Sequence, residues 1–307
     1  MLGFADRLAA AVRRTKTPTL VGLDPRAETL PQGLLDPAVS KDPAAVAEAF
    51  RVFCRGVIDV VAPLVPAVKP QVAFFEEVGP HGMLALADVI RYAASKQLLV
   101  VVDGKRNDIG STATAYAHGW LGAGELSPWG GDALTVSPYL GDDSLDPFVE
   151  VCTARHAGIF VLVKTSNPGG KTFQDRAIDG QPLYRHVANY VEGIAAQTAS
   201  ECGYSSIGAV VGATYPEQLA ELRSAMPHTW FLIPGFGAQG GTARDVAPAF
   251  DAQGLGGIVN NSRGIIFAHS RKEYRDTFGD ARWQDAVAAA TRDMIAQLAA
   301  DTPAGKL

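Results

Sequence analysis

The stretch "LLVVVDGKRNDIGSTATAYA", residues 98–117, is the part of the sequence from which the fold can be predicted most directly. Its first five residues are all apolar, which is typical of a parallel strand that is buried on both faces. A cluster of charged residues follows, and a helical pattern then runs over residues 110–122. A buried strand that leads into a helix is the repeating unit of α/β proteins.

The same unit recurs along the whole chain. The strand candidates are residues 19–24, 67–75, 98–103, 132–137, 158–164, 207–212, 230–234 and 256–261. The helical patterns cover residues 43–62, 80–96, 110–122, 144–156, 182–201, 215–226, 242–252 and 281–300. Eight strands alternating with eight helices, with no break in composition, predict a single (β/α)8 TIM barrel domain over residues 1–307. A doubly wound sheet is the main alternative, but it needs fewer strands.

Two further segments lie outside the eight strand–helix units. Phe4, Leu8 and Val12 repeat at helical spacing, which predicts a short amphipathic N-terminal helix over about residues 2–14. Residues 165–183 are expected to form a long loop after the fifth strand. A loop of that length in a compact domain is usually functional or mobile.

The overall composition limits the partners of the protein. A net charge of −5 over 307 residues gives no broad attraction to nucleic acid or to anionic membranes. No apolar run reaches the roughly 20 residues of a membrane span, and no secretion signal is recognised. Three widely spaced cysteines, Cys54, Cys152 and Cys202, have no metal-ligand pattern and are expected to be reduced thiols. We therefore expect a cytoplasmic protein with no nucleic-acid or membrane partner.

Charged residues collect where the predicted strands end, which is where barrel enzymes keep their chemistry. Asp103 and Lys105 are two residues apart, so in an extended chain both face the barrel mouth. Alone, the two residues would fit a solvated surface ion pair, and Asp108 would fit a helix cap. Asp24 and Lys69 stand at two other strand ends, and such a set of charges is costly to assemble unless the charges pair and act.

The stretch "PGFGAQGG", residues 234–241, has the G-x-G-x-x-G spacing of a dinucleotide site. Such a fingerprint opens the first βαβ unit and needs an acidic residue about 20 positions later. Here it follows the seventh strand, and Asn260 and Asn261 stand where the acid would be. The loops after strands seven and eight of barrels commonly bind phosphate. We therefore expect Gly237, Gly240, Gln239 and Arg263 to bind a phosphate, the alternative being a flexible loop beside a surface arginine.

Six stretches in order carry a resemblance to a known family: "VGLDPR", "VKPQVAFFE", "DGKRNDIGSTA", "KTSNPGG", "PGFGAQGG" and "NNSRGI". With them the chain resembles the orotidine 5′-phosphate decarboxylases, and specifically their longer bacterial subfamily (type 2). The resemblance covers nearly the whole chain. It implies a barrel homodimer that removes CO₂ from orotidine 5′-monophosphate to give UMP, with no metal and no organic cofactor.

The resemblance also implies roles for the charged residues. Lys105 would donate the proton to C6 of the pyrimidine, and Asp103 would lie near the departing carboxylate. Lys69 would join their network, and Asp108 would reach the site of the neighbouring subunit to complete it.

The remaining site residues implied by the resemblance would bind the substrate. Asp24 would hold the ribose, and Ser166 would contact the pyrimidine edge. Gln239 and Arg263 would bind the phosphate.

Three other functions stay open at this point. A related barrel enzyme uses a similar D-x-K-x-x-D element with Mg²⁺ on sugar phosphates. A Schiff-base aldolase would use Lys69, Lys105 or Lys164 as its nucleophile, although two flanking aspartates favour a charged Lys105. The third alternative is a nucleotide-binding module without catalysis.

Overall fold

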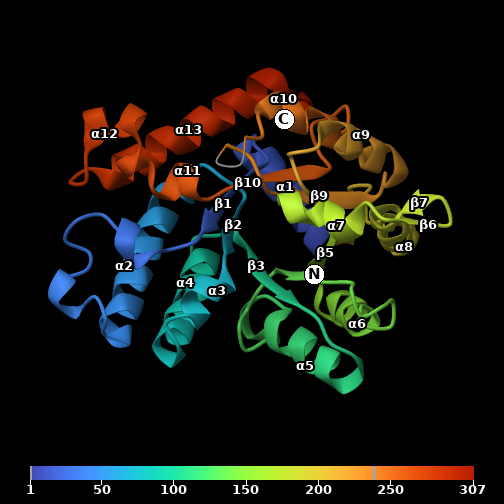
Figure 1. The fold of residues 1–307 in the computed structure, drawn as a ribbon, viewed down its shortest axis with the longest axis horizontal. Helices are drawn as coiled ribbons and strands as arrows, with labels where there is room; N and C mark the ends of the chain where they lie inside the picture. Colours follow the sequence, from blue (N-terminus) through green and yellow to red (C-terminus); the bar gives the residue numbers. More distant parts are fainter. Residues whose placement is uncertain (1, 238–239) are drawn as a thin grey trace.

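The computed structural model describes residues 2–237 and 240–307, and its centre is a closed barrel of parallel strands (Figure 1). The strands follow one another around the barrel in the order β1, β10, β9, β8, β5, β4, β3, β2. Their bounds are β1 Thr19–Leu23, β2 Ala67–Pro70, β3 Leu99–Arg106, β4 Ala133–Val136, β5 Gly158–Lys164, β8 Ser205–Val211, β9 Thr229–Ile233 and β10 Gly257–Asn261. Each strand overlaps one of the eight predicted segments, although β3 runs three residues further than predicted, so the predicted (β/α)8 barrel is confirmed.

Helices surround the barrel, as Figure 1 shows. They are α2 Pro43–Val61, α3 Val72–Glu76, α4 Pro80–Ser95, α5 Gly110–Trp120, α6 Asp146–Arg155, α8 Leu183–Gln197, α9 Pro216–Ala225, α10 Ala243–Val246, α11 Arg263–Ile266, α12 Lys272–Phe278 and α13 Trp283–Asp301. Helix α13 packs against α2, so the last helix of the barrel covers the first. Among the described residues, none of the helices has the length and apolar character needed to cross a membrane.

Two predicted elements end earlier than the sequence suggested. The strand predicted over residues 67–75 stops at Pro70, and α3 begins two residues later, where Gln71 caps the helix by accepting the N–H of Ala73. Val72 and Phe75 are both buried and are three residues apart, which is helical rather than strand spacing. The helix predicted over 242–252 is only α10 followed by a 3-10 turn, because Pro248 in that turn has no N–H with which to continue it.

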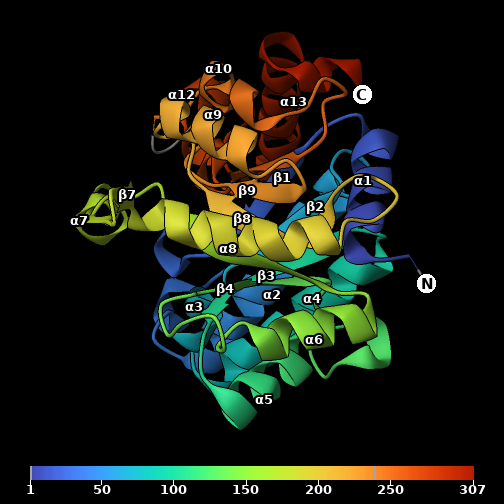
Figure 2. The same cartoon turned by 90° about the vertical axis from the view of Figure 1, so that its right-hand side faces the viewer.

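The N-terminal helix α1, Phe4–Thr15, closes one end of the barrel. Phe4, Leu8 and Val12 are buried against side chains that fill the barrel interior, and the Phe4 ring meets Phe160 edge-on at 5.9 Å. Figure 2 shows α1 and the N-terminus on one side of the barrel and α7, Lys171–Gln174, on the opposite side. The interior is therefore filled at the N-terminal ends of the strands and left for a site at their C-terminal ends.

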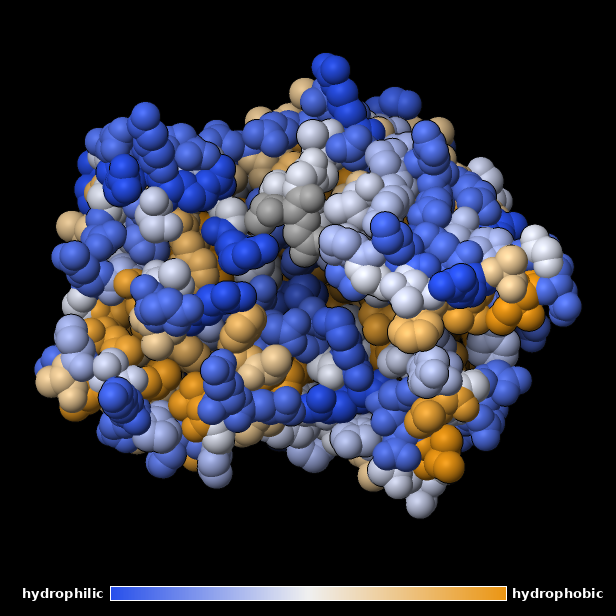
Figure 3. All heavy atoms as spheres, in the orientation of Figure 1, coloured by the Kyte–Doolittle hydropathy of each residue, from blue (hydrophilic) through white to orange (hydrophobic). Residues whose placement is uncertain are grey.

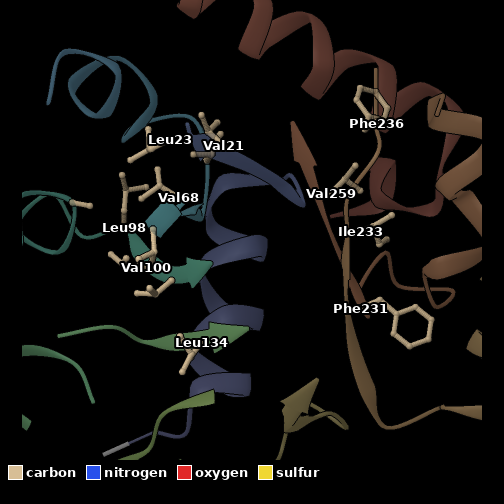
Figure 4. Close-up of a cluster of buried hydrophobic side chains, with 14 of the residues drawn as sticks. Val21, Leu23, Val68, Leu98, Val100, Leu134, Phe231, Ile233, Phe236 and Val259 are labelled. Atoms are coloured by element: carbon tan, nitrogen blue, oxygen red, sulfur yellow. The ribbon is translucent and has the colours of Figure 1, made fainter. Parts of the chain in front are cut away.

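The strands alternate between two buried faces. Val21, Val68, Val100 and Leu134 face outward into the core between barrel and helices (Figure 4). Their neighbours Leu20, Ala67, Val101 and Ala133 face inward against α1. Two residues further along the inner face stand Gly22, Lys69, Asp103 and Thr135. The inner face thus changes from apolar to polar along the strands.

The segment after β5, expected to be one long loop, has structure of its own. It contains a 3-10 turn, Pro168–Gly170, helix α7 and the two-stranded hairpin β6 Ala177–Ile178 with β7 Gln181–Pro182. Fully buried Lys164 forms an ion pair with Asp175 at the end of α7, beside the rings of Tyr184 and Tyr215. These contacts fix the base of the segment next to β5.

Candidate active site

A cavity of about 270 Å³ opens at the C-terminal ends of the strands. Figure 3, which has the orientation of Figure 1, shows a hollow with hydrophilic side chains near the centre of this face. Of the predicted site residues, the cavity brings together Asp24, Lys69, Asp103, Lys105 and Ser166. They come from the ends of β1, β2, β3 and β5, as expected for a barrel whose inner face turns polar there.

The carboxylate of Asp103 is the centre of the charged group, and both of its oxygens accept hydrogen bonds. Oδ2 accepts from Lys69 Nζ at 2.6 Å and from Gln71 Nε2 at 3.0 Å. Oδ1 accepts from Lys105 Nζ at 2.6 Å and from the Thr135 hydroxyl at 2.9 Å. Two lysines therefore share this one carboxylate, and Asp24 supplies a second negative charge to the same cavity.

Burial and charge act in opposite directions on this group. Burial alone would raise the pKa of Asp103, but the charges of Lys69 and Lys105 and their hydrogen bonds hold that pKa well below its usual range. Burial alone would lower the pKa of Lys69, whose side chain is 4% exposed, but the charges of Asp103 and Asp24 raise it instead. Asp103 and Lys69 are therefore both held in their charged forms. The Lys105 side chain is 49% exposed and reaches into the open part of the cavity.

The backbone beside these residues is irregular. Val102 pairs with Leu134 and Arg106 pairs with Val136, so Asp103, Gly104 and Lys105 of β3 lie opposite Thr135 alone. Lys105 has a φ of 45°, a left-handed conformation that side chains rarely adopt. The bulge turns both functional side chains toward the cavity.

On the side of β1 and β10, the cavity has two side-chain acceptors that no other described residue binds. Asp24 Oδ1 and Asn260 Oδ1 are buried and have no hydrogen-bond partner among the residues that the structure describes. Buried acceptors gain most from a ligand that donates, such as a sugar hydroxyl. This arrangement suits a ribose.

A second cavity, of about 540 Å³, adjoins the first and shares Asp24, Gln71 and Lys105 with it. Arg263, the first residue of α11, lines this second cavity and is exposed. Of the cavity's other arginines, Arg106 is bound to Glu76 at 2.5 Å. Arg263 thus stands within reach of the substrate cavity but outside its lining.

The glycine-rich loop after β9 has a tight internal structure. Gly237 and Gly240 have φ values of 69° and 95°, which only glycine adopts readily. The Gly237 N–H donates to the Gly241 carbonyl at 2.8 Å, and the Gly240 N–H donates to the Gly237 carbonyl at 2.9 Å. These two N–H groups shape the turn, and α10 behind it is too short to add the dipole expected of a longer helix. Gln239 lies outside the described residues.

Asp108 lies outside the lining of both cavities. Its Oδ1 accepts the N–H of the next residue, Ile109, at 2.8 Å. The Ile109 side chain is 55% exposed. Within one chain, then, Asp108 does not join Lys69, Asp103 and Lys105.

Sequence reasoning assigned no role to three of the cavity's polar residues, Gln71, Thr135 and Asn260. Two of them could have been found by counting along the inner face, since Thr135 follows inward-facing Ala133 and Asn260 follows inward-facing Ile258. Gln71 lies beyond Pro70, where strand alternation no longer predicts direction.

Comparison with known proteins places this chain in a family. Residues 21–276 match the model of the orotidine 5′-phosphate decarboxylase / HUMPS family. An orotidine 5′-phosphate decarboxylase of Rhodopirellula baltica is 58% identical over 300 residues, which cover 97% of this chain and 99% of that protein.

Solved structures agree with this match. A putative orotidine 5′-phosphate decarboxylase of Streptomyces avermitilis is 34% identical, with a TM-score of 0.78, over 98% of this chain and 96% of that one. The OMP decarboxylase of Leishmania donovani is 32% identical, with a TM-score of 0.74, over 98% of each chain. The chain belongs to the orotidine 5′-phosphate decarboxylase / HUMPS family.

Proposed function

We propose that the chain is a decarboxylase that converts orotidine 5′-monophosphate to UMP and CO₂. The observation that carries this proposal within the family is the pair of lysines, Lys69 and Lys105, on the single carboxylate of Asp103. The raised pKa of Lys69 is the opposite of what a Schiff-base nucleophile needs. The arrangement instead favours electrostatic catalysis by fixed charges.

In the proposed reaction, the bond between C6 and the carboxylate breaks and its electron pair stays on C6. Lys105 stabilises this carbanion and then gives C6 a proton, and solvent returns the proton to the lysine. Asp103 lies near the departing carboxylate and holds the Lys105 ammonium in position. Lys69 balances the charge of Asp103 from the buried side of the site.

One ammonium group is too weak to account for such a reaction alone. At about 4 Å and an effective dielectric constant near 20, it contributes about 4 kcal/mol, or roughly a thousandfold in rate. The rest must come from a preorganised site that excludes water and from binding energy of distant substrate groups. We infer that Asp24 and Asn260 bind the ribose, Ser166 the pyrimidine edge, and Arg263 with Gln239 the phosphate.

The decisive experiment follows the loss of orotidine 5′-monophosphate absorbance with purified protein in the presence of EDTA. We expect turnover that EDTA does not reduce. Activity on a sugar phosphate that needs added Mg²⁺ would favour the related metal-dependent barrel enzymes. Tight UMP binding without turnover would favour a binding module.

We further infer that two copies of the chain share their sites as a homodimer. The second cavity lies beside Lys105 and has room for a segment of another chain. Asp108 and exposed Ile109 lie in the β3–α5 connection and line neither of these two cavities. In the proposed dimer, Asp108 of one copy completes the network of Lys69, Asp103 and Lys105 in the other.

Mixed dimers test this inference. Lys105→Ala and Asp108→Ala subunits should each be inactive alone but should recover about half of the wild-type activity per mixed dimer, since one of its two sites is intact. The measurement is turnover after co-expression with two different affinity tags and purification of the mixed species. If verified mixed dimers stay inactive, Asp108 does not act across the interface.

Arg263→Ala should impair use of the phosphorylated substrate more than catalysis itself. The guanidinium makes a charge-assisted contact that the variant loses, so kcat/KM for orotidine 5′-monophosphate should fall by about 10- to 100-fold. Turnover of orotidine, which has no phosphate, should change little. Equal losses for both substrates would show that Arg263 acts on something other than the phosphate.

A further inference from the structure

The hydroxyl of Thr135 connects the two halves of the bulge in β3. Its oxygen accepts the backbone N–H of Lys105 at 2.9 Å, and it lies 2.9 Å from Oδ1 of Asp103. Thr135 is the single β4 residue opposite Asp103, Gly104 and Lys105. The side chain therefore takes the place that a ladder carbonyl would fill in a regular pair of strands.

The direction of both hydrogen bonds follows from the groups involved. The Lys105 N–H can only donate, so the hydroxyl oxygen accepts from it. The lowered pKa keeps Asp103 ionised, and an ionised carboxylate can only accept, so the hydroxyl proton points to Oδ1. Thr135 is 1% exposed, so water does not replace either bond.

We propose that Thr135 is a positioning residue for the reaction: its hydroxyl holds the Lys105 backbone in its left-handed conformation and fixes the Asp103 carboxylate against it. The inference rests on the proposed function, because it concerns the lysine that acts on C6. A left-handed φ at a residue other than glycine persists only where surrounding contacts hold it. One such contact is the hydrogen bond from the Lys105 N–H to the Thr135 hydroxyl. The same hydroxyl also binds Asp103, which in turn holds the Lys105 ammonium.

The expected consequence is a loss of rate rather than of binding. Displacement of a catalytic group by about 1 Å can cost about a hundredfold in rate. Lys105 sits at the open end of the cavity, so release of its backbone lets the ammonium swing away from C6. The ribose and phosphate contacts proposed above do not involve Thr135.

The test compares Thr135→Val with Thr135→Ser. Valine keeps the shape and the strand preference of threonine but lacks the hydroxyl, whereas serine keeps the hydroxyl. We expect Thr135→Val to lower kcat about 10- to 100-fold with little change in KM or in UMP affinity. Thr135→Ser should return kcat to within about threefold of the wild type, because the two hydrogen bonds remain.

Thr229→Val is the matched control. Thr229 is also a fully buried strand residue whose hydroxyl donates to a carboxylate, that of Glu192 at 2.7 Å, but it stands at the start of β9, at the other end of the barrel. This variant should lower Tm and leave kcat unchanged. A kcat loss as large as that of Thr135→Val would mean that removal of any buried hydroxyl slows the enzyme, which would overturn the proposal.

Two further results would also overturn it: a wild-type kcat for Thr135→Val, or a Thr135→Ser variant as slow as the valine variant. If Thr135→Val does not fold, Thr135→Ala replaces it, and a wild-type kcat in that variant has the same meaning. If the wild-type protein releases no CO₂, the proposed function fails and this inference with it. If the wild type is active and only the valine–serine difference is missing, the proposed function stands and the role of Thr135 does not.

Discussion

Lys105→Ala is expected to reduce CO₂ release by at least about a thousandfold, because it removes both the nearest cation and the proton donor. The side chain of Lys105 lies in the cavity and its ammonium is held at 2.6 Å from Asp103, so no other lysine of the described site can take its position without moving. The measurement is kcat for orotidine 5′-monophosphate, together with the affinity for UMP. Binding of UMP should persist, since the ribose and phosphate contacts are unchanged.

Two variants make this result interpretable. Lys96→Ala removes an exposed lysine that pairs with Asp59 outside the site, and its activity should equal that of the wild type. Lys105→Arg keeps the charge, but a guanidinium is a poor proton donor and has a different shape. Near-normal turnover by Lys105→Ala would refute the role assigned to this lysine.

Asp103→Asn should have the largest effect on stability. The substitution leaves Lys69 buried with a neutral partner, and loss of one member of a buried ion pair costs about 3–5 kcal/mol in the free energy of unfolding. The same change loosens Lys105, so kcat should fall by about a hundredfold or more. Urea unfolding and initial rates measure the two effects separately.

Asp88→Asn is the control for this variant. Asp88 binds Arg55 at 2.5 Å, but both side chains are partly exposed, and a pair of that kind contributes about 0–1 kcal/mol. A loss of stability in Asp103→Asn no larger than that in Asp88→Asn would contradict the importance of burial at the central pair.

The pH dependence of wild-type stability follows from the same group. The folded protein holds the pKa of Asp103 below the unfolded value of about 3.9, so the ionised form stabilises the fold above that pH. This contribution is lost as the pH falls below about 4 toward the lowered pKa. Asp103→Asn lacks the group and should therefore show a weaker loss of stability in the acid range.

The sequence predicted the barrel because its signal is periodic and local. Each strand candidate is short, apolar and followed by a helix, and chain order alone then places the strand ends together. Lys69 and Asp103 could be predicted as neighbours for this reason, and their 2.6 Å contact bears this out. Asp24 and Ser166 reach the same cavity on the same argument.

Features that depend on contacts between distant segments could not be predicted from the sequence. The bulge in β3 forms because three of its residues lie opposite one residue of β4. The sequence of residues 103–105 alone does not predict that pairing. Similarly, the segment after β5 folds around the contact of Lys164 with Asp175, which joins two positions with no shared periodicity. Strand alternation predicts where side chains point only while the strand is regular.

The closure of the barrel between β1 and β10 also has a consequence for the order in which the protein folds. Thr19 pairs with Val259, so the first strand made must wait for the last before its free edge is covered. Contacts between such distant segments are slow to form. The lysines and Asp103 lie on the neighbouring early strands β2 and β3, whereas Asp24 and Asn260 line the cavity from the ends of β1 and β10, on the two sides of that final seam. The charged centre can therefore form before the barrel closes, but the side of the pocket that Asp24 and Asn260 line is completed only in the last step of folding.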